Sequence, residues 1–353
     1  MRKLAVIAGA TGVIGRGLTD QLSVRPDWDV VALARKPVDV PGARFIPVDL
    51  TDAEDCRAKF TDLGGTTHIV YAGRFEHVAN QPEPVEKNLS MLRNVVEHIE
   101  AQAPNLAHVH LVHGTKWYGS DLGPFLTPAQ EEDPRSVRTT FYYAQQDWLA
   151  ERQLGKAWSW SATRPHGICH AVPNSPRNIV LVIAVYALIC REMGLPLCFP
   201  GTEANYRALY QCTSSDHLVD AILWMSETPS CANEAFNITN GDYIRWERLW
   251  PAFARHFGME AGPVRTVKLA TAMGDKAPVW DAIVRKYGLT APPYERLALW
   301  SYGDFVFTPG WDIMSDMTKA RQRGFGRAVR TQDEFIRYFN HFSKAGVLPS
   351  ARS

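Results

Sequence analysis

The sequence lacks the features that mark several classes of protein. Its 38 Lys and Arg residues are balanced by 37 Asp and Glu, so there is neither the basic excess that favours nucleic-acid binding nor a strong acidic excess. Its six cysteines are scattered, without a Cys-x-x-Cys pair or a spacing that suits zinc. We therefore expect reduced cysteines in the core of a cytoplasmic protein, with no metal site and no nucleic-acid partner.

Long hydrophobic runs are also missing. The most apolar stretch, residues 179–190, has about a dozen residues, whereas a membrane-spanning helix needs roughly 20. We expect a helix that is buried in the protein or against another subunit, and no membrane partner. The short apolar run at residues 4–8 breaks into glycines too soon for a signal peptide and is better explained as a first strand.

What the sequence does contain is a regular alternation of short apolar runs and helical segments. The runs lie at residues 4–8, 30–34, 44–48, 68–72, 109–113 and 159–163. This order predicts an α/β protein with a Rossmann-type, doubly wound parallel sheet. We assign residues 1–165 to a dinucleotide-binding domain, with later segments completing its sheet, and residues 166–353 to a smaller, mainly helical lobe that binds the substrate.

Two helices are marked by one-sided apolar patterns. The first, expected to cover the sheet, carries Val85, Leu89, Leu92, Val96 and Ile99 on one face. The second, in the C-terminal half, carries a stripe of Trp246, Leu249, Trp250, Phe253 and Phe257. Pairing through residues 89–99 and 142–154 would give a homodimer, although a monomer that buries these faces against its own lobe would show the same pattern.

A glycine-rich loop follows the first expected strand and precedes a helix at residues 13–22. It reads Gly9-Ala10-Thr11-Gly12-Val13-Ile14-Gly15. Glycines let the backbone turn tightly and approach a diphosphate, and the N–H groups at the start of the helix attract an anion. The loop therefore predicts dinucleotide binding by Gly9, Thr11, Gly12, Val13, Ile14 and Gly15. The alternative is a tight turn with a purely structural role.

The end of the second strand bears on which dinucleotide is bound. An acidic residue there would bond a ribose 2′-hydroxyl, whereas a basic residue accommodates a 2′-phosphate. This sequence has Arg35 and Lys36, which favours NADPH. The alternative is that both are solvated loop charges.

The segment after the third strand offers a contact for the adenine. We expect Asp49 to accept a hydrogen bond from the adenine amino group and Leu50 to cover the ring. Capping of the next helix by Thr51 or Asp52 is an equally good use of this segment.

Candidate catalytic residues follow the fifth strand. Ordinary short-chain reductases place a Tyr and a Lys four residues apart on one helix, but here Tyr142 and Tyr143 are followed at that distance by Gln146 and Asp147. A lysine, Lys116, lies instead in the turn after the fifth strand. Because the carboxyl end of that strand borders the cofactor crevice, Lys116 and a tyrosine from the next helix can converge there.

Taken together, several motifs make the chain resemble the progesterone 5β-reductase and iridoid synthase (PRISE) group of atypical short-chain reductases along nearly its whole length. They are the Gly9 loop, Ala34-Arg35-Lys36, Gly114-Thr115-Lys116-Trp117-Tyr118, Phe141-Tyr142-Tyr143, Trp160-Ser161-Ala162-Thr163-Arg164-Pro165, residues 233–242, Pro278-Val279-Trp280 and Tyr287-Gly288-Leu289-Thr290.

The resemblance implies reduction by NADPH of a carbon–carbon double bond conjugated to a carbonyl, with Tyr142 and Lys116 as the catalytic pair and Tyr143 as the fallback. Hydride addition to the β-carbon sends negative charge to the carbonyl oxygen, which a phenol stabilises by a hydrogen bond. A nearby cation would lower the pKa of that phenol. The alternative is that Lys116 is a surface cation and Tyr142 a core phenol.

Further contacts are expected around this pair. Cofactor contacts are assigned to Tyr71, Ala72, Pro165 and Ile168. Substrate-pocket positions are assigned to Arg74, Trp117, Phe125 and Tyr143, with core packing as the alternative for the aromatic residues. We expect His113, His166 and His170 to pack or to form hydrogen bonds rather than to bind metal.

Two departures from the family concern the substrate. Plant members place an aromatic residue after the fourth strand, where this chain has Arg74, and the segment from His166 to His170 also differs from the usual pattern. Arg74 would either bind an acidic group of the substrate or face solvent. Two other functions stay open: a carbonyl reductase or alcohol dehydrogenase of the extended short-chain type, and a dinucleotide-sensing protein without catalysis.

Overall fold

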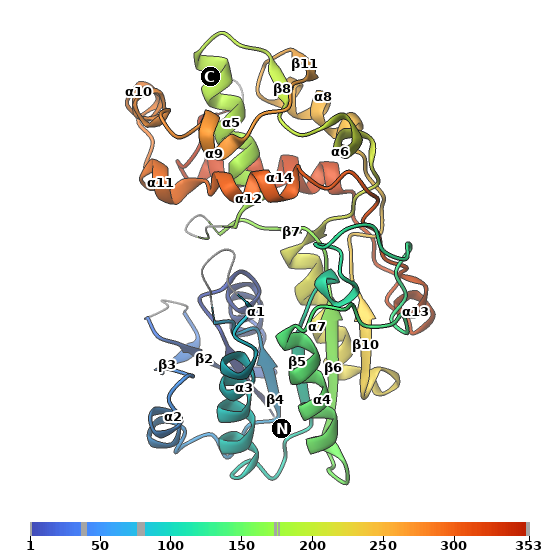
Figure 1. The fold of residues 1–353 in the computed structure, drawn as a ribbon. Helices are drawn as coiled ribbons and strands as arrows, with labels where there is room; N and C mark the ends of the chain where they lie inside the picture. The colour runs from blue at the N-terminus through green and yellow to red at the C-terminus, as the bar shows by residue number, and fades with distance from the viewer. Residues whose placement is uncertain (1, 37–40, 76–81, 173–174, 176, 351–353) are drawn as a thin grey trace.

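The fold is centred on one parallel sheet that supports a separate group of helices (Figure 1). It is given by a computed structural model, which describes residues 2–36, 41–75, 82–172, 175 and 177–350. Seven strands form the sheet in the order β10-β6-β5-β4-β1-β2-β3. They are β1 (Lys3–Ala8), β2 (Trp28–Ala34), β3 (Ala43–Pro47), β4 (His68–Tyr71), β5 (His108–Val112), β6 (Ser159–Arg164) and β10 (Glu234–Asn237).

Every neighbouring pair in this sheet is parallel. The strand order reverses beside β1, where β4 lies on one side and β2 on the other, so the predicted doubly wound sheet is confirmed. Residues 5–8 of β1 are completely buried because helices cover both faces of the sheet. The strand β10, which comes after residue 165, forms one edge of the sheet beside β6.

Helices cover the two faces of the sheet. On one face lie α1 (Val13–Ser23) and α7 (Ser215–Glu227), and on the other lie α2 (Ala53–Lys59), α3 (Val85–Glu100) and α4 (Phe141–Gln153). The expected apolar face of α3 is buried at Leu89, Leu92, Val96 and Ile99, while Val85 at its first turn is half-buried. A homodimer through α3 and α4 stays a prediction.

A second group of elements, which we call the helical lobe, lies beyond the carboxyl ends of the strands (Figure 1). It contains α5 (Ile179–Glu192), β8 (Leu197–Phe199), α6 (Glu203–Arg207), α8 (Trp246–His256), β11 (Ala261–Val264), α9 (Leu269–Ala272), α10 (Ala277–Tyr287), α11 (Tyr294–Leu297), α12 (Trp300–Val306) and α14 (Thr331–Lys344). Residues 179–190 of α5 are all buried, as expected for the apolar run. The aromatic stripe of α8 packs against them in one core.

The chain passes between the sheet and the helical lobe several times. Three short elements lie at these crossings: β7 (Ile168–Cys169), β9 (Thr213–Ser214) and α13 (Thr318–Gln322). Two short helices, η1 (Thr115–Tyr118) and η2 (Pro229–Cys231), instead follow β5 and α7. β7 pairs with β9, and the Tyr338 hydroxyl of α14 lies 3.0 Å from the Ser214 hydroxyl just before α7. The expected boundary at residue 165 divides the sequence but not the sheet, because β10 comes after it. The assignment of the two domains stays a prediction.

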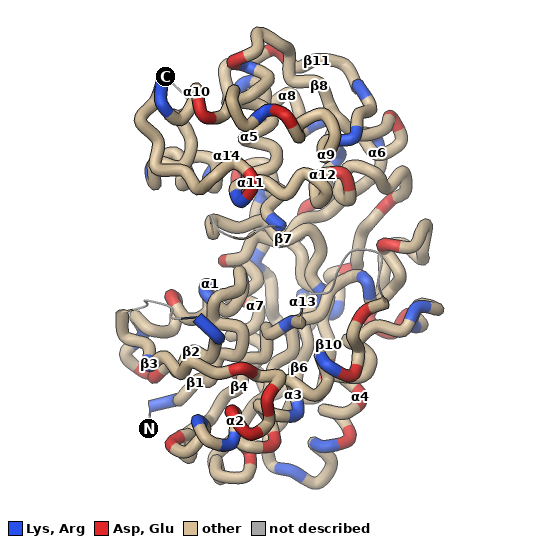
Figure 2. The backbone as a smooth tube through the Cα atoms, turned by 60° about the vertical axis from the view of Figure 1, so that its left-hand side comes forward, with Lys and Arg blue, Asp and Glu red and all other residues tan. Residues whose placement is uncertain are grey.

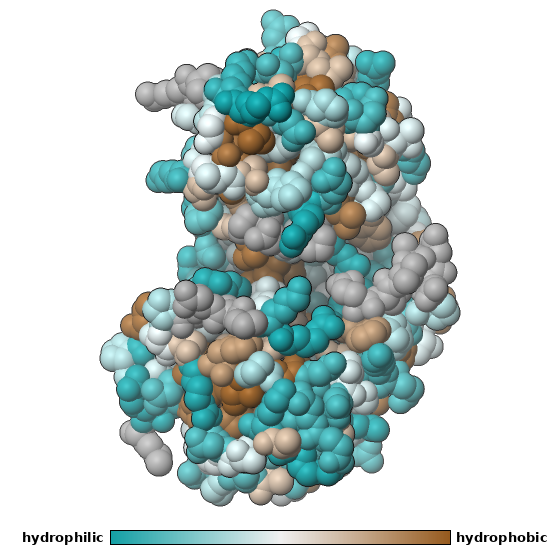
Figure 3. Space-filling model, turned by 90° about the vertical axis from the view of Figure 1, so that its left-hand side faces the viewer, coloured by the Kyte–Doolittle hydropathy of each residue, from teal (hydrophilic) through white to brown (hydrophobic). Residues whose placement is uncertain are grey.

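The charges are mixed over the molecule. Figure 2 shows basic and acidic positions both around the sheet and on the helical lobe, in keeping with a formal net charge of +1. In the part of the chain that the structure describes, no helix is both long and apolar enough to cross a bilayer. The space-filling view shows a concave surface between the part that contains the sheet and the helical lobe, and hydrophobic side chains are visible there (Figure 3).

Candidate active site

The glycine loop after β1 is shaped by close backbone contacts. Gly9 has a φ of 83°, which favours glycine, and a Cβ built on it would lie 2.8 Å from the carbonyl carbon of Ala72 and 2.9 Å from the nitrogen of Gly73. The segment after β4 therefore passes directly against the loop after β1. A side chain at Gly9 would therefore force the two segments apart.

The start of α1 is open to an anion. Gly12 is its N-cap and provides no side-chain hydrogen bond, and the first turn carries no acidic residue. A Cβ on Gly15 would lie 2.2 Å from the carbonyl oxygen of Gly9, so this position requires glycine for the helix to approach the loop. Val13 is half-buried and Ile14 is buried, so Ile14 can meet a diphosphate only through its backbone, whereas Thr11 is exposed. These features fit a dinucleotide diphosphate.

The residues expected around the adenosine end lie in two adjacent loops. Arg35 and Lys36 are exposed at the end of β2. Asp49 is exposed after β3 and lies close enough to Arg35 for that cation to lower its pKa, although hydrogen bonds from the backbone and hydroxyl of Thr51 lower it more. This arrangement presents two exposed cations beside the carboxylate of Asp49.

The capping alternative for this segment is confirmed for Asp52. Asp52 is the N-cap of α2 and accepts hydrogen bonds from the backbone of Glu54 and Asp55. Leu50 is buried in the core between the sheet and its helices, so little of its side chain remains to cover an adenine. Tyr71 is likewise buried in this core, and burial raises its pKa. Tyr71 can therefore contact a cofactor only through its backbone, as can Ala72 through the carbonyl that faces Gly9.

Tyr142 lies at the start of α4, over the ends of β5 and β6. Thr140 is the N-cap of this helix. The Tyr142 ring packs on His113 with centroids 4.8 Å apart. A Cβ built on Gly114 would lie 3.4 Å from the Tyr142 hydroxyl and 3.5 Å from the carbonyl oxygen of Pro165. The phenol therefore points to the carboxyl edge of the sheet, where a parallel sheet binds its ligands.

Lys116 lies in η1, directly after β5, and is held between two carboxylates. Its Nζ lies 3.5 Å from Oε1 of Glu83 and 3.6 Å from Oδ2 of Asp121. The side chains of Glu83 and Asp121 are only 7% and 8% exposed, so both carboxylates need cationic partners. Arg138 supplies a second cation to Asp121 at 2.6 Å.

The electrostatic effect on Tyr142 differs from the expected one. Its pKa is raised to about 12, first by burial and further by Glu83 and Asp121, while Arg74 and Arg177 act in the opposite direction. Among the described residues no hydrogen bond joins Lys116 to Tyr142. The largest effects on the pKa of this phenol come from burial, Arg74 and Glu83 rather than from Lys116. The assignment of the two residues as a catalytic pair stays a prediction.

Tyr143 occupies a different environment from its neighbour. Its hydroxyl donates to the carbonyl of Trp117 and accepts a hydrogen bond from the backbone of Ser136. Tyr143 and Trp117 are buried in a small core of their own, in which the guanidinium of Arg164 lies 3.7 Å from the Trp117 ring. The structure thus places both in packing positions. Phe125, by contrast, is half-buried and touches this small core as well as that of the helical lobe.

Arg74 lies beside Tyr142 rather than in solvent. Its side chain is 25% exposed, and its guanidinium lies 5.7 Å from the ring of Phe141 and 3.9 Å from Oε1 of Glu83. Among the remaining expected contacts, the Pro165 carbonyl accepts a hydrogen bond from the Thr115 backbone, and Ile168 is half-buried in β7.

The three histidines near the site are neutral. Burial lowers the pKa of His113 well below its ordinary value, and lowers those of His166 and His170 to about 4. His166 bonds the Thr115 hydroxyl at 2.5 Å. No group of three or more His, Cys, Asp or Glu that could hold a metal is found within the described ranges.

Sequence reasoning missed Glu83, Asp121 and Thr140. The Thr140 hydroxyl donates to Glu83 at 2.9 Å, so one carboxylate connects the start of α4 to Lys116. The three residues lie in separate segments and share no periodic pattern. The one available signal was indirect, since a lysine in a partly buried site calls for acidic neighbours.

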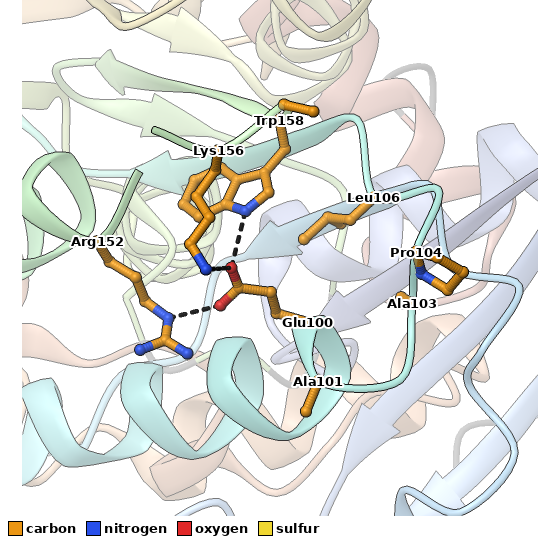
Figure 4. A pocket seen from close by; sticks show the side chains of 9 residues that line it. Glu100, Ala101, Ala103, Pro104, Leu106, Arg152, Lys156 and Trp158 are labelled. Atoms are coloured by element: carbon orange, nitrogen blue, oxygen red, sulfur yellow. Dashed lines mark hydrogen bonds and ion pairs between the residues drawn. The ribbon is translucent and has the colours of Figure 1, made fainter. Parts of the chain in front are cut away.

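A separate pocket of about 320 Å³ lies elsewhere on the domain (Figure 4). Its residues precede β5 and β6, so it is at the opposite edge of the sheet from Tyr142. Its Glu100 carboxylate is bound by Arg152 at 2.7 Å and by Lys156 and Trp158 at 3.1 Å each. With these partners in place, the carboxylate has no evident catalytic use.

Known proteins similar to this chain agree with this geometry. The profile of the PRISE-like Rossmann-fold domain matches residues 48–349. The chain is 33% identical to an (S)-8-oxocitronellyl enol synthase of Nepeta racemosa, covering 98% of this chain and 93% of that protein. It is 34% identical to the 3-oxo-Delta(4,5)-steroid 5-beta-reductase of Arabidopsis thaliana, with coverage of 98% and 93%.

Solved structures show the same fold at lower sequence identity. The enzyme WbmG of Bordetella bronchiseptica, solved in complex with NAD, superposes with a TM-score of 0.65 at 14% identity, covering 99% of this chain and 96% of that one. A UDP-glucose 4-epimerase of Thermotoga maritima gives a TM-score of 0.65 at 14% identity, with coverage of 96% and 98%. At these identities the likeness concerns the fold alone.

Proposed function

This chain belongs to the PRISE-like Rossmann-fold family, and we propose that it uses NADPH to reduce a carbon–carbon double bond conjugated to a carbonyl. The relatives described above are named as a reductase and an enol synthase, so the chain is an enzyme of the oxidoreductase type. The name of the Arabidopsis relative describes such a substrate, since the double bond of a 3-oxo-Delta(4,5)-steroid lies next to its carbonyl. Other relatives are named for different products, so the natural substrate is a separate question.

One observation supports the proposal most strongly. The hydroxyl of Tyr142 lies over Gly114 at the carboxyl edge of the sheet, and its pKa is raised to about 12. A phenol with this pKa stays protonated at neutral pH and is therefore a hydrogen-bond donor. A donor placed beside a substrate carbonyl stabilises the negative charge that hydride addition creates there.

The residues present fit the cofactor. Gly9, Gly12 and Gly15 would hold the diphosphate against the start of α1, and Arg35 and Lys36 would bind the 2′-phosphate. NADPH supplies the hydride. The chain itself orients the substrate carbonyl toward Tyr142, and the α-carbon of the resulting enolate then takes a proton from water.

Lys116 and its carboxylates have a positioning role in this proposal. Glu83 connects Lys116 to Thr140, the N-cap of the helix that carries Tyr142. The contacts keep the phenol at the end of β5 while the cation remains beside the reaction site. We propose Tyr142 as the donor and Lys116 as the cation that supports it.

The main alternative is exchange between a carbonyl and an alcohol. In the oxidation direction this chemistry needs the Tyr142 phenolate as a base, and a pKa of about 12 makes that form scarce at neutral pH. The alternative of a non-catalytic dinucleotide sensor makes no use of a protonated phenol at the edge of the sheet.

The test is to incubate the enzyme with NADPH and either 2-cyclohexenone or cyclohexanone and to identify the products by mass spectrometry and NMR. We expect cyclohexanone from the enone and no turnover of cyclohexanone itself. Formation of alcohols alone would reject conjugate reduction. Because 2-cyclohexenone is only a small surrogate, a panel of longer enones and enals would accompany it, scored in the same way.

A further inference from the structure

We propose that Arg74 binds a carboxylate on the substrate, so that the enzyme prefers enones or enals that carry an acidic group. This inference rests on the proposed function and names the substrate class for the same site. The position of Arg74, its lack of strong partners and the charge around it support the inference independently.

The position of Arg74 is fixed by the backbone. Gly73, which precedes it, packs against Gly9 of the glycine loop. The Arg74 guanidinium lies 5.7 Å from the centroid of the Phe141 ring, and that ring contacts the Tyr142 ring with centroids 4.6 Å apart. Arg74 is therefore close to both the cofactor loop and the phenol, where a substrate has to lie.

Within the described part of the chain, the Arg74 guanidinium has few polar partners. Its Nε is buried without a hydrogen-bond partner, and its ion pair with Glu83 is long, at 3.9 Å. Glu83 is shared, because it also accepts the Thr140 hydroxyl at 2.9 Å and lies 3.5 Å from Lys116. A guanidinium has five N–H donors, and leaving them without partners in a partly buried site costs free energy. A ligand carboxylate would supply two acceptors in the geometry that arginine prefers.

The other two cations of the site have shorter ion pairs with carboxylates than Arg74 has. Arg138 contacts Asp121 at 2.6 Å, and Lys116 lies between Glu83 and Asp121. This group of side chains contains three cations, Arg74, Lys116 and Arg138. The cations contact only the two carboxylates of Glu83 and Asp121 within the group, which leaves one positive charge in excess. The excess favours an anionic ligand, and Arg74 is the member of the group with the longest ion pair.

A carboxylate is the anion that agrees best with these observations, but a phosphate of the cofactor has similar chemistry and lies on the same side of the sheet. The two sources make different demands. If Arg74 binds the substrate, its loss changes discrimination between charged and neutral substrates; if it binds the cofactor, its loss weakens NADPH binding for every substrate.

The experiment uses 6-oxohex-4-enoic acid and its methyl ester, which differ in charge and by one methyl group. We expect the enzyme to favour the acid in kcat/KM by about 10- to 100-fold, the value of a charge-assisted hydrogen-bonded contact. Arg74→Gln should bring this ratio close to one, because kcat/KM should fall much more for the acid than for the ester. Arg74→Lys, which keeps the charge, should retain part of the preference. Arg93→Gln, on the outer face of α3, serves as the matched control and should leave the ratio unchanged.

A binding measurement separates this inference from the proposed function. Calorimetry of the saturated acid and its ester with the NADP⁺-loaded enzyme requires no turnover, and the acid should bind more tightly to the wild type only. If the enzyme reduced carbonyls instead of double bonds, this preference would remain although the proposed function would have failed. The inference is overturned by equal binding of acid and ester to the wild type, by equal losses for both in Arg74→Gln, or by a rise in the KM of NADPH with an unchanged ratio.

Discussion

Lys116 Nζ lies 3.5 Å from Oε1 of Glu83, and this contact joins the turn after β5 to the start of α4. Glu83 connects the two segments because its carboxylate also accepts a hydrogen bond from the hydroxyl of Thr140, the N-cap of α4. The lysine that sequence reasoning treated as the direct partner of the phenol is thus bound first to carboxylates. Its charge remains in the site, while burial keeps the pKa of Tyr142 raised to about 12.

The first prediction concerns this lysine. Lys116→Met should lower kcat and reduce the free energy of unfolding by roughly 1 to 3 kcal/mol, because two mostly buried carboxylates lose a partner. Steady-state kinetics and urea denaturation measure the two effects. Lys319→Met is the matched control, since Lys319 also bonds two carboxylates, Glu132 and Glu234, the second of which is the first residue of β10. A Lys116 variant with full kcat would remove this residue from the mechanism.

The second prediction distinguishes the two neighbouring tyrosines. Tyr142→Phe should lower kcat by about 100- to 1000-fold, the usual effect of removing an oxyanion donor, with little change in Tm. Tyr143→Phe should instead lower Tm and leave kcat of the folded enzyme nearly unchanged, because its hydroxyl bonds Trp117 and Ser136. The reverse pattern would transfer the catalytic role to Tyr143.

A third prediction tests the choice of cofactor. Arg35→Ala should raise the KM of NADPH by about 10- to 100-fold and change the KM of NADH little, because only the former has a 2′-phosphate to bind. Arg25→Ala is the control, since Arg25 is a half-buried arginine that precedes β2 at the opposite end of that strand from Arg35. Equal losses with both nucleotides would argue against a phosphate contact by Arg35.

The fourth prediction follows from the pKa of Glu131, which burial raises to about 7. Because this folded-state pKa lies above the ordinary value of 4.5, stability from this group is complete at low pH and is lost as pH rises through 7. The loss amounts to at most about 3 kcal/mol. Glu131→Gln keeps an oxygen that can accept the Asn237 N–H and removes the titration.

Urea denaturation of the wild type and Glu131→Gln at pH 5 and pH 8 measures this effect. The variant should gain stability relative to the wild type at pH 8 but not at pH 5. A difference between the two proteins that does not change with pH would contradict the raised pKa.

The sheet could be predicted from sequence because its strands carry a local signal. β1, β2 and β4 are short, mainly apolar runs, and burial on both faces of a parallel sheet demands such runs. β10 carries less of this signal, since Glu234 and Asn237 are polar and lie at its ends. Its place beside β6 depends on pairing between distant residues, which no local pattern encodes.

The site was predicted less completely, for related reasons. The glycine loop is a contiguous motif whose backbone requirements can be inferred directly from sequence, and its geometry agrees with them. The roles of Tyr142 and Tyr143 cannot be separated in this way, because adjacent residues on a helix differ by only a rotation about its axis. The contacts of Lys116 with Glu83 and Asp121 join separate segments, so they become visible only in three dimensions.

The repeated crossings of the chain have a consequence for dissecting the protein. A fragment that ends at residue 165 would lose β10 from the edge of the sheet and α7 from its face, leaving the apolar side chains of α1 uncovered. We therefore expect such a fragment to aggregate rather than to bind nucleotide on its own. Exchanging the helical lobe with that of a relative would likewise require a graft joined at every crossing, with Tyr338 kept in reach of Ser214.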